Sequence, residues 1–163
     1  MSQKTPEQRL ADAGLLLPAP QKPSGNYAPV RRFGQLLFVA GHGPKDADGN
    51  YMCGRLSGES DIARGYEAAR AAALNLLATV KESVGNLDAV EGVLKVLGMV
   101  NADPAFTAHP EVIDGCSDVL VTAFGERGLH ARSAVGMGSL PHGMSVEVEA
   151  ILCLLYTSPS PRD

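Results

Sequence analysis

The sequence predicts an α/β protein, a two-layer sandwich in which a mixed sheet has two main helices on one face. Two segments, near residues 60–84 and 110–124, carry apolar side chains at three- and four-residue steps, as helices with one buried face do. Runs rich in valine, isoleucine and leucine precede, separate and follow these segments, which is typical of strands. Two such helices suffice to cover only one face of the sheet.

The N-terminal third predicts one short helix and three strands. The stretch TPEQ at residues 5–8 is a helix start, since threonine caps, proline suits the first position and glutamine completes a capping box. We expect this helix to reach about Leu15 and to be followed by a proline-rich linker. Two apolar runs around Gly34-Gln35 predict a strand pair. YMCGRL, after the turn signal Asp48-Gly49, predicts a third, short strand.

The remaining elements alternate between helix and strand. The longer helix is expected to end at Gly85 and the second, opened by Pro110, at Gly125. Between them, VEGVLKVLGMV is apolar on both strand faces, which predicts a central strand. We assign Leu94, Val96 and Val100 to one face and Val93, Leu97 and Met99 to the other. HARSAVGMGS and SVEVEAIL predict the last two strands.

Composition narrows the classes of function. With 163 residues and 45% hydrophobic side chains, the chain is expected to form one domain. A net charge of −4 disfavours a nucleic-acid partner and favours a small polar ligand. Three cysteines without metal-type spacing indicate a reducing compartment rather than a disulfide framework. No signal peptide and no apolar run of membrane-spanning length is visible, so we expect a soluble, cytoplasmic protein without a membrane partner.

The last eleven residues, CLLYTSPSPRD, have a different character from the rest. They match the translation of a transposon-end adapter used in preparing sequencing libraries. We therefore expect residues 153–163 to lie outside the native domain, although an unstructured natural tail would have a similar composition.

Four motifs resemble the landmarks of the reactive intermediate deaminase (RidA, YjgF-like) family, in the same order. They are GNYAPV at 25–30, FVAGHGP at 38–44, HARSAVGMGSLP at 130–141 and VEVEAI at 146–151. The resemblance implies a RidA-like domain over residues 25–152, preceded by a helix and linker over 1–24. It also implies a chorismate-mutase-like fold, a homotrimer with clefts between subunits, and hydrolysis of enamines and imines such as 2-aminoacrylate to 2-oxo acids and ammonia.

The same resemblance places the family arginine at Arg132, its acid at Glu147 and its pocket tyrosine at Tyr27. Other positions depart from the family pattern. The usual Ser-Gly-Gln is Ala40-Gly41-His42, a serine is replaced by Ala28, a proline or alanine by His130, and an asparagine is replaced near His109-Pro110. The chain therefore resembles a divergent branch, in which the range of substrates is expected to differ.

The residue types suit this chemistry. An arginine binds a carboxylate through two parallel hydrogen bonds, so Arg132 would position a 2-imino acid. Hydrolysis needs a proton shuttle, and a partly desolvated carboxylate such as Glu147 can serve. Backbone groups at Gly41 and Ala134 would orient the remaining ligand atoms. We expect Arg132 and Glu147 to project from neighbouring strands into one cleft, without a cofactor. The four histidines have no metal-type spacing, so no metal site is expected.

Other interpretations of these residues remain open. The alternation in SVEVEAIL is compatible with a Glu147 side chain that faces water. Arg132 could instead form a surface ion pair with a glutamate across the strands. Tyr27 could instead be a packing residue. At the level of function, the alternatives are a non-catalytic trimer that binds a small carboxylate as a sensor or scavenger and, less favoured by the acidic charge, an endoribonuclease.

Overall fold

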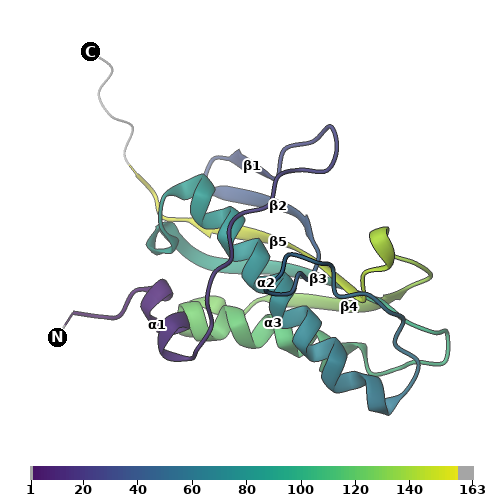
Figure 1. Ribbon diagram of the computed structural model, residues 1–163. Coiled ribbons are helices and arrows are strands. Elements are labelled where there is room, and N and C mark those ends of the chain that lie inside the picture. The colour runs from purple at the N-terminus through teal and green to yellow at the C-terminus, as the bar shows by residue number, and fades with distance from the viewer. Residues whose placement is uncertain (1, 158–163) are drawn as a thin grey trace.

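The computed structural model describes residues 2–157 and contains a five-stranded sheet with three α-helices (Figure 1). The strand order is β1-β2-β5-β3-β4, and only the β3–β4 pair is parallel. In chain order the elements are α1 (Pro6–Asp12), β1 (Val30–Phe33), β2 (Leu36–His42), α2 (Ile62–Val84), β3 (Val90–Asn101), α3 (His109–Phe124), β4 (Ala131–Met137) and β5 (Val146–Leu154).

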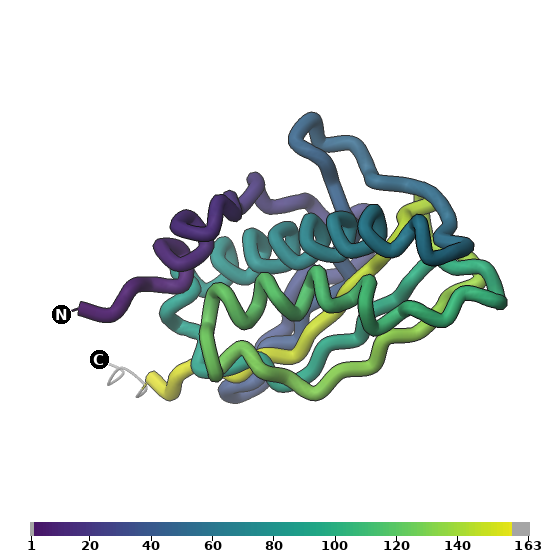
Figure 2. Tube along the Cα trace, turned by 90° about the horizontal axis from the view of Figure 1, so that it is seen from below, coloured from purple at the N-terminus to yellow at the C-terminus, as the bar shows by residue number. Residues whose placement is uncertain are grey.

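Helices α2 and α3 lie side by side on one face of the sheet, and α1 packs at one end against α3 (Figure 2). The core fills the space between the two layers. On β5, Val146, Val148 and Leu152 point into it and are fully buried, whereas Glu147, Glu149 and Ile151 lie on the face without helices. The predicted two-layer fold is therefore confirmed.

The predicted start of α1 and the predicted ends of α2 and α3 are confirmed as well. Thr5 and Gln8 form the capping box at the start of α1, and α2 and α3 end at Gly85 and Gly125, with φ values of 93° and 62°. These left-handed conformations favour glycine, which has no Cβ to clash with the preceding turn. Helix α1 ends at Asp12, three residues before the predicted Leu15.

The predicted third strand, YMCGRL, is wrong. Tyr51, Cys53 and Leu56 form only isolated bridges, to Lys45, Met144 and Ala102 respectively. These three partners lie in three separate segments of the chain. In the part of the chain that the structure describes, no continuous strand therefore runs beside residues 51–56, and a stretch without such a partner cannot form a ladder.

The predicted faces of β3 are also partly wrong. Val93, Val96 and Val100 all lie on the helix-covered face, with at most 3% exposure, whereas Leu94 is 44% exposed. The cause is a register shift between Val93 and Lys95 in the pairing with β5. Such an irregularity inserts one residue into the strict alternation. β3 does lie inside the sheet, between β5 and β4.

Strand β5 continues two residues beyond the expected domain boundary at Leu152. Leu154 is buried, its N–H donates to the carbonyl of Gln35 at 2.7 Å, and the Gln35 side chain donates to its carbonyl at 3.0 Å. Cys153 and Leu154 therefore belong to the sheet, although the expected domain ended at Leu152. Residues 158–163, most of the predicted tail, lie outside the described residues. No helix within residues 2–157 is long and apolar enough to cross a membrane.

Candidate functional site

A pocket of about 420 Å³ opens where β2 ends and β5 begins. The loop before β1, the loop after β2 and the turn before β5 form its walls. The residues used below are Tyr27, Gly41, Lys45, Tyr51, His142 and Glu147. Three of the predicted site residues, Tyr27, Gly41 and Glu147, are thus brought together.

Glu147 is the acid of this pocket. It follows Val146 at the start of β5, and alternation along the strand places it on the face without helices, opposite Met99 of β3. It is partly buried. Burial raises the pKa of Glu147, and the negative charge of Glu149 on the same face raises it further. This carboxyl group is therefore protonated more readily than an exposed glutamate.

Gly41 provides the space that Glu147 occupies. A Cβ at position 41 would overlap with the carboxylate oxygen Oε1 of Glu147, so the glycine permits this approach of the carboxylate to the backbone of β2. The register of the β2–β5 pair shifts between Val39 and His42, at the point where Gly41 meets the acid. The sequence indicated a backbone role for Gly41, whereas the structure adds a steric one.

Buried polar side chains from α2 fix the β2 wall of the pocket. His42 donates from Nδ1–H to the carbonyl of Ala40 at 2.7 Å and accepts at Nε2 from the hydroxyl of Thr79 at 2.8 Å. Burial lowers the pKa of His42, so the ring is held neutral. Asn75 donates to the carbonyl of Gly43 at 2.8 Å. Asn75 and Thr79, four residues apart in an otherwise apolar helical segment, were the sequence signal that could have identified these supports.

One wall of the pocket combines a cation with two rings. The ammonium of Lys45 lies 4.8 Å from the centre of the Tyr51 ring. The His142 ring stacks on Tyr51 with centres 4.7 Å apart, and His142 has φ +58°, a left-handed conformation that is uncommon for a residue other than glycine. Sequence periodicity could not predict this wall, because its members come from the loop after β2 and the turn before β5.

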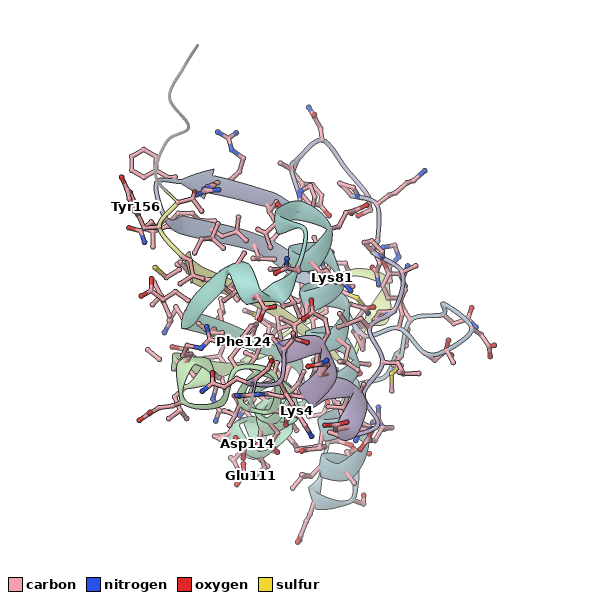
Figure 3. All side chains as sticks on the ribbon, turned by 90° about the vertical axis from the view of Figure 1, so that its left-hand side faces the viewer. Lys4, Lys81, Glu111, Asp114, Phe124 and Tyr156 are labelled. Carbon is pink, nitrogen blue, oxygen red and sulfur yellow. The ribbon has the colours of Figure 1, made fainter. Side chains whose placement is uncertain are left out.

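Arg132 lies on the other face of the sheet. On β4 it is paired with Val96, whose side chain is buried under the helices. Its Nη1 donates to the carboxylate of Asp114 at 2.7 Å and to the hydroxyl of Ser117 at 3.0 Å, both on α3. Nη2 makes a weak contact of 3.4 Å with the carbonyl of Pro110. Figure 3 labels Asp114 on α3, at the end of the molecule away from β1 and β2.

The prediction that Arg132 and Glu147 project from neighbouring strands into one cleft is therefore wrong for a single chain. Their strands, β4 and β5, are separated by β3, and the two side chains lie on opposite faces. Ala134 belongs with Arg132, since it packs against the core from β4. The alternative of an ion pair between Arg132 and a glutamate of β5 is also wrong, because its acidic partner is Asp114.

His130 supports Arg132 through Ser117. The ring donates from Nδ1–H to the carbonyl of Gly128 at 2.7 Å, and in the neutral tautomer Nε2 accepts the hydroxyl proton of Ser117 at 2.9 Å. The Ser117 oxygen can then accept from Arg132. His130, which stands where the family has proline or alanine, is therefore a link in the anchoring of the arginine.

Part of the guanidinium lacks a strong hydrogen-bond partner in the described part of the chain, and the Arg132 side chain is 22% exposed. Within residues 2–157 the Arg132 Nε makes no hydrogen bond, and Nη1 carries both strong ones. The N–H groups of Nε and Nη2 can therefore donate two parallel hydrogen bonds to a carboxylate. Among the described residues, no three histidine, cysteine or acidic side chains are close enough to hold a metal ion.

Comparison with known proteins identifies the family to which the chain belongs. The sequence profile described as "YjgF/chorismate mutase-like, putative endoribonuclease" matches residues 7–157. The chain belongs to this family. The resemblance noted in the sequence is thereby confirmed.

Relatives of this YjgF-like chain span nearly its whole length. Protein TCP17 of Trypanosoma cruzi is 40% identical over 140 residues, which cover 85% of this chain and 88% of that protein. A crystal structure of Atu1372, a protein of unknown function from Agrobacterium tumefaciens, is 39% identical with a TM-score of 0.83, and each chain is covered to 92%. A putative endoribonuclease from Shewanella oneidensis MR-1 is 32% identical with a TM-score of 0.87, covering 93% of this chain and all of its own.

RidA from an Antarctic Psychrobacter shares the fold. It is 23% identical, with a TM-score of 0.58, and covers 83% of this chain and 94% of its own. The chain thus shares its fold with a protein named RidA, and a relative at 32% identity is named as a putative endoribonuclease.

Proposed function

We propose that this protein hydrolyses 2-imino acids, and their enamine tautomers such as 2-aminoacrylate, to 2-oxo acids and ammonia. The observation that carries this proposal is Glu147, a partly buried acid with a raised pKa that faces a pocket beside Gly41. Membership of a family that includes RidA supports the same chemistry.

The reaction needs only proton transfers and one water molecule. Water adds through its oxygen to the imine carbon, Glu147 delivers a proton to the nitrogen, and its carboxylate then accepts a proton from the added water. This gives a carbinolamine. A second proton then passes from its hydroxyl group through Glu147 to the nitrogen, and the carbon–nitrogen bond breaks as the carbonyl forms and ammonia leaves. Carbon keeps its oxidation state, so no redox partner enters. A carboxyl group with a raised pKa suits both directions of transfer near neutral pH.

Two chains are needed to bring Arg132 to this acid. Because Arg132 and Glu147 lie on opposite faces of one sheet, a cleft that holds both takes the arginine from one subunit and the glutamate from another. There, the open Nε–Nη2 edge of Arg132 would bind the substrate carboxylate and Glu147 would act on the adjacent imine carbon.

The uncovered sheet face favours such an assembly. Phe38, Leu97 and Ile151 line a shallow groove there, next to Lys95 and Glu149, and Phe38 is 44% exposed. An apolar surface of this kind is typical of an interface, and a closed homotrimer would cover it in every copy. Sedimentation at micromolar concentration tests the trimer, and a monomeric parent protein would contradict it.

Subunit mixing tests the shared cleft. Arg132→Ala and Glu147→Gln are each expected to be nearly inactive in ammonia release from 2-imino acids generated in situ by an amino acid oxidase. After dissociation and reassembly of an equal mixture, random assortment should restore about a quarter of the parent activity if each site takes one residue from each of two chains. No recovery in mixed trimers would contradict a site shared between subunits.

The name endoribonuclease in the family description and in the Shewanella relative makes RNA cleavage the second candidate. The acidic chain, with a net charge of −4, is a poor surface for phosphate backbones. RNA cleavage that survives purification and is lost in Glu147→Gln would favour this candidate. Binding of a 2-oxo acid that requires Arg132, without release of ammonia, would favour a sensor or scavenger.

A further inference from the structure

Lys45 is a cation in the pocket that forms no ion pair with any described residue. Its side chain is partly buried, and its ammonium is held 4.8 Å from the centre of the Tyr51 ring. The backbone of Lys45 also forms a bridge with Tyr51, so the cation and the ring are fixed relative to each other. Within residues 2–157, no carboxylate lies within ion-pair distance of Lys45.

The charge balance of the pocket favours an anionic ligand. Lys22 at the rim adds a second positive charge, whereas Glu147 is the acid that lines the pocket. The raised pKa of Glu147 increases its neutral fraction. The walls therefore carry an excess of positive charge, which an anion from solution can neutralise.

The size of the pocket favours a substrate longer than 2-aminoacrylate. At about 420 Å³, it falls in the range of sites that hold ligands much larger than a three-carbon acid. A ligand whose imine carbon lies at Glu147 has room to extend along the wall formed by Lys45, Tyr51 and His142. This wall offers a cation and aromatic surface, and hence a place for a second charged end.

We propose that Lys45 binds a second carboxylate, at the side-chain end of the substrate, and that the site therefore selects dicarboxylic 2-imino acids. The inference rests on the proposed function. It divides the work between two cations: Arg132 of a neighbouring subunit binds the carboxylate beside the reacting carbon, and Lys45 binds the distal one. The second carboxylate is not consumed, so the reaction remains hydrolysis to a 2-oxo acid and ammonia.

Binding of stable product analogues tests the selection without turnover. 2-Oxoglutarate and 2-oxopentanoate have the same five-carbon chain and differ in the distal carboxylate. Isothermal titration calorimetry on the parent protein should show 2-oxoglutarate binding about 10- to 100-fold more tightly, as for a hydrogen bond between charged groups in a partly buried site. A parent that binds both acids equally would overturn the inference.

The variant Lys45→Met should lose this preference, with the affinity for 2-oxopentanoate unchanged. Lys81→Met, the same change in the last turn of α2 and outside the pocket, should keep it; Lys81 is labelled in Figure 3. Lys45→Arg, which retains the charge, should restore most of it. A preference for 2-oxoglutarate that survives Lys45→Met would overturn the inference. An equal loss of affinity for both acids would also overturn it, because Lys45 would then bind the carboxylate beside the oxo group, which both acids have.

Hydrolysis measurements separate this inference from the proposed function. With 2-iminoglutarate and 2-iminopentanoate as substrates, Lys45→Met should raise KM for the first about tenfold or more and leave kcat similar. If the parent releases ammonia from neither imine yet prefers 2-oxoglutarate through Lys45, the hydrolase proposal fails and the dicarboxylate site stands. If the parent and Lys45→Met each hydrolyse both imines equally well, the dicarboxylate site fails and the hydrolase proposal stands.

Discussion

On the helix-covered face of the sheet, Arg132 has its charge matched by Asp114 at 2.7 Å and its position fixed by Ser117. On the face without helices, Glu147 and Lys45 line one pocket, and neither forms an ion pair with a described residue. The charge of Arg132 is therefore already paired within the chain, although its Nε and Nη2 donors lack strong partners among the described residues. The charges of Glu147 and Lys45 are left for a ligand to neutralise, so within one chain the pocket of Glu147 is the better prepared site for a charged ligand.

The largest effect is expected from Glu147, the acid on the face of the sheet without helices, which we call the open face. Glu147→Gln keeps the shape of the side chain but removes the proton shuttle, which should lower kcat about 10²–10⁴-fold. Binding of a 2-oxo acid should survive. The matched control is Glu149→Gln, two residues along the same face, which should keep most of the activity. Steady-state ammonia release checks both variants, and equal activity of the two would remove Glu147 from the mechanism.

The next largest effect is expected on the free energy of unfolding, which should differ between variants on the two faces of the sheet. Leu152 is fully buried on the helix-covered face, so Leu152→Ala should reduce the free energy of unfolding by about 2–5 kcal/mol. Its neighbour Ile151 is partly buried on the open face. Ile151→Ala should cost less in urea melts at protein concentrations where subunits are separated. A larger loss for Ile151 than for Leu152 would show that the open face is already covered within one chain.

The anchoring of Arg132 predicts a smaller effect. Ser117→Ala removes the hydroxyl between Arg132 and His130, and the loss of one such bond costs about 1 kcal/mol. We expect KM for a 2-imino acid to rise about fivefold while kcat changes little. Thr122→Ala is the control, because its hydroxyl bonds to the carbonyl of Asp118 on the same helix. If both alanine variants changed KM alike, the effect would come from α3 in general.

Two titrating groups should give the smallest effects, with opposite signs. Because the pKa of Glu147 is raised by folding, the unfolded state releases its proton first, and stability should fall as pH rises above 4.5 through the raised value. The pKa of buried His42 is lowered, so stability should fall as pH drops below 6.5 toward the lowered value.

Urea melts across pH 4–8 check these signs. Glu147→Gln should remove the decline on the alkaline side, and His42→Gln should remove the decline on the acidic side. A slope that remains unchanged in its own variant would show that another group titrates there.

The sequence by itself determined the helices, the ends of the two long ones and the strand pair around Gly34. These features depend on local causes: capping side chains, the left-handed conformations that glycine accepts, and apolar periodicity. The family motifs also identified Tyr27, Gly41 and Glu147, and the structure does bring them to one pocket.

Only the tertiary structure decided which face each charged side chain occupies. Alternation gives the relative direction of neighbours along one strand, but the order β5-β3-β4 determines that Arg132 and Glu147 come from strands that do not touch. A single irregular residue near Leu94 placed Val93 and Leu94 on the faces opposite to those predicted. Sequence periodicity could not predict the wall formed by Lys45, Tyr51 and His142 either. Lys45 and Tyr51 follow β2 and His142 precedes β5, and these two loops lie together only because β2 and β5 pair in the sheet.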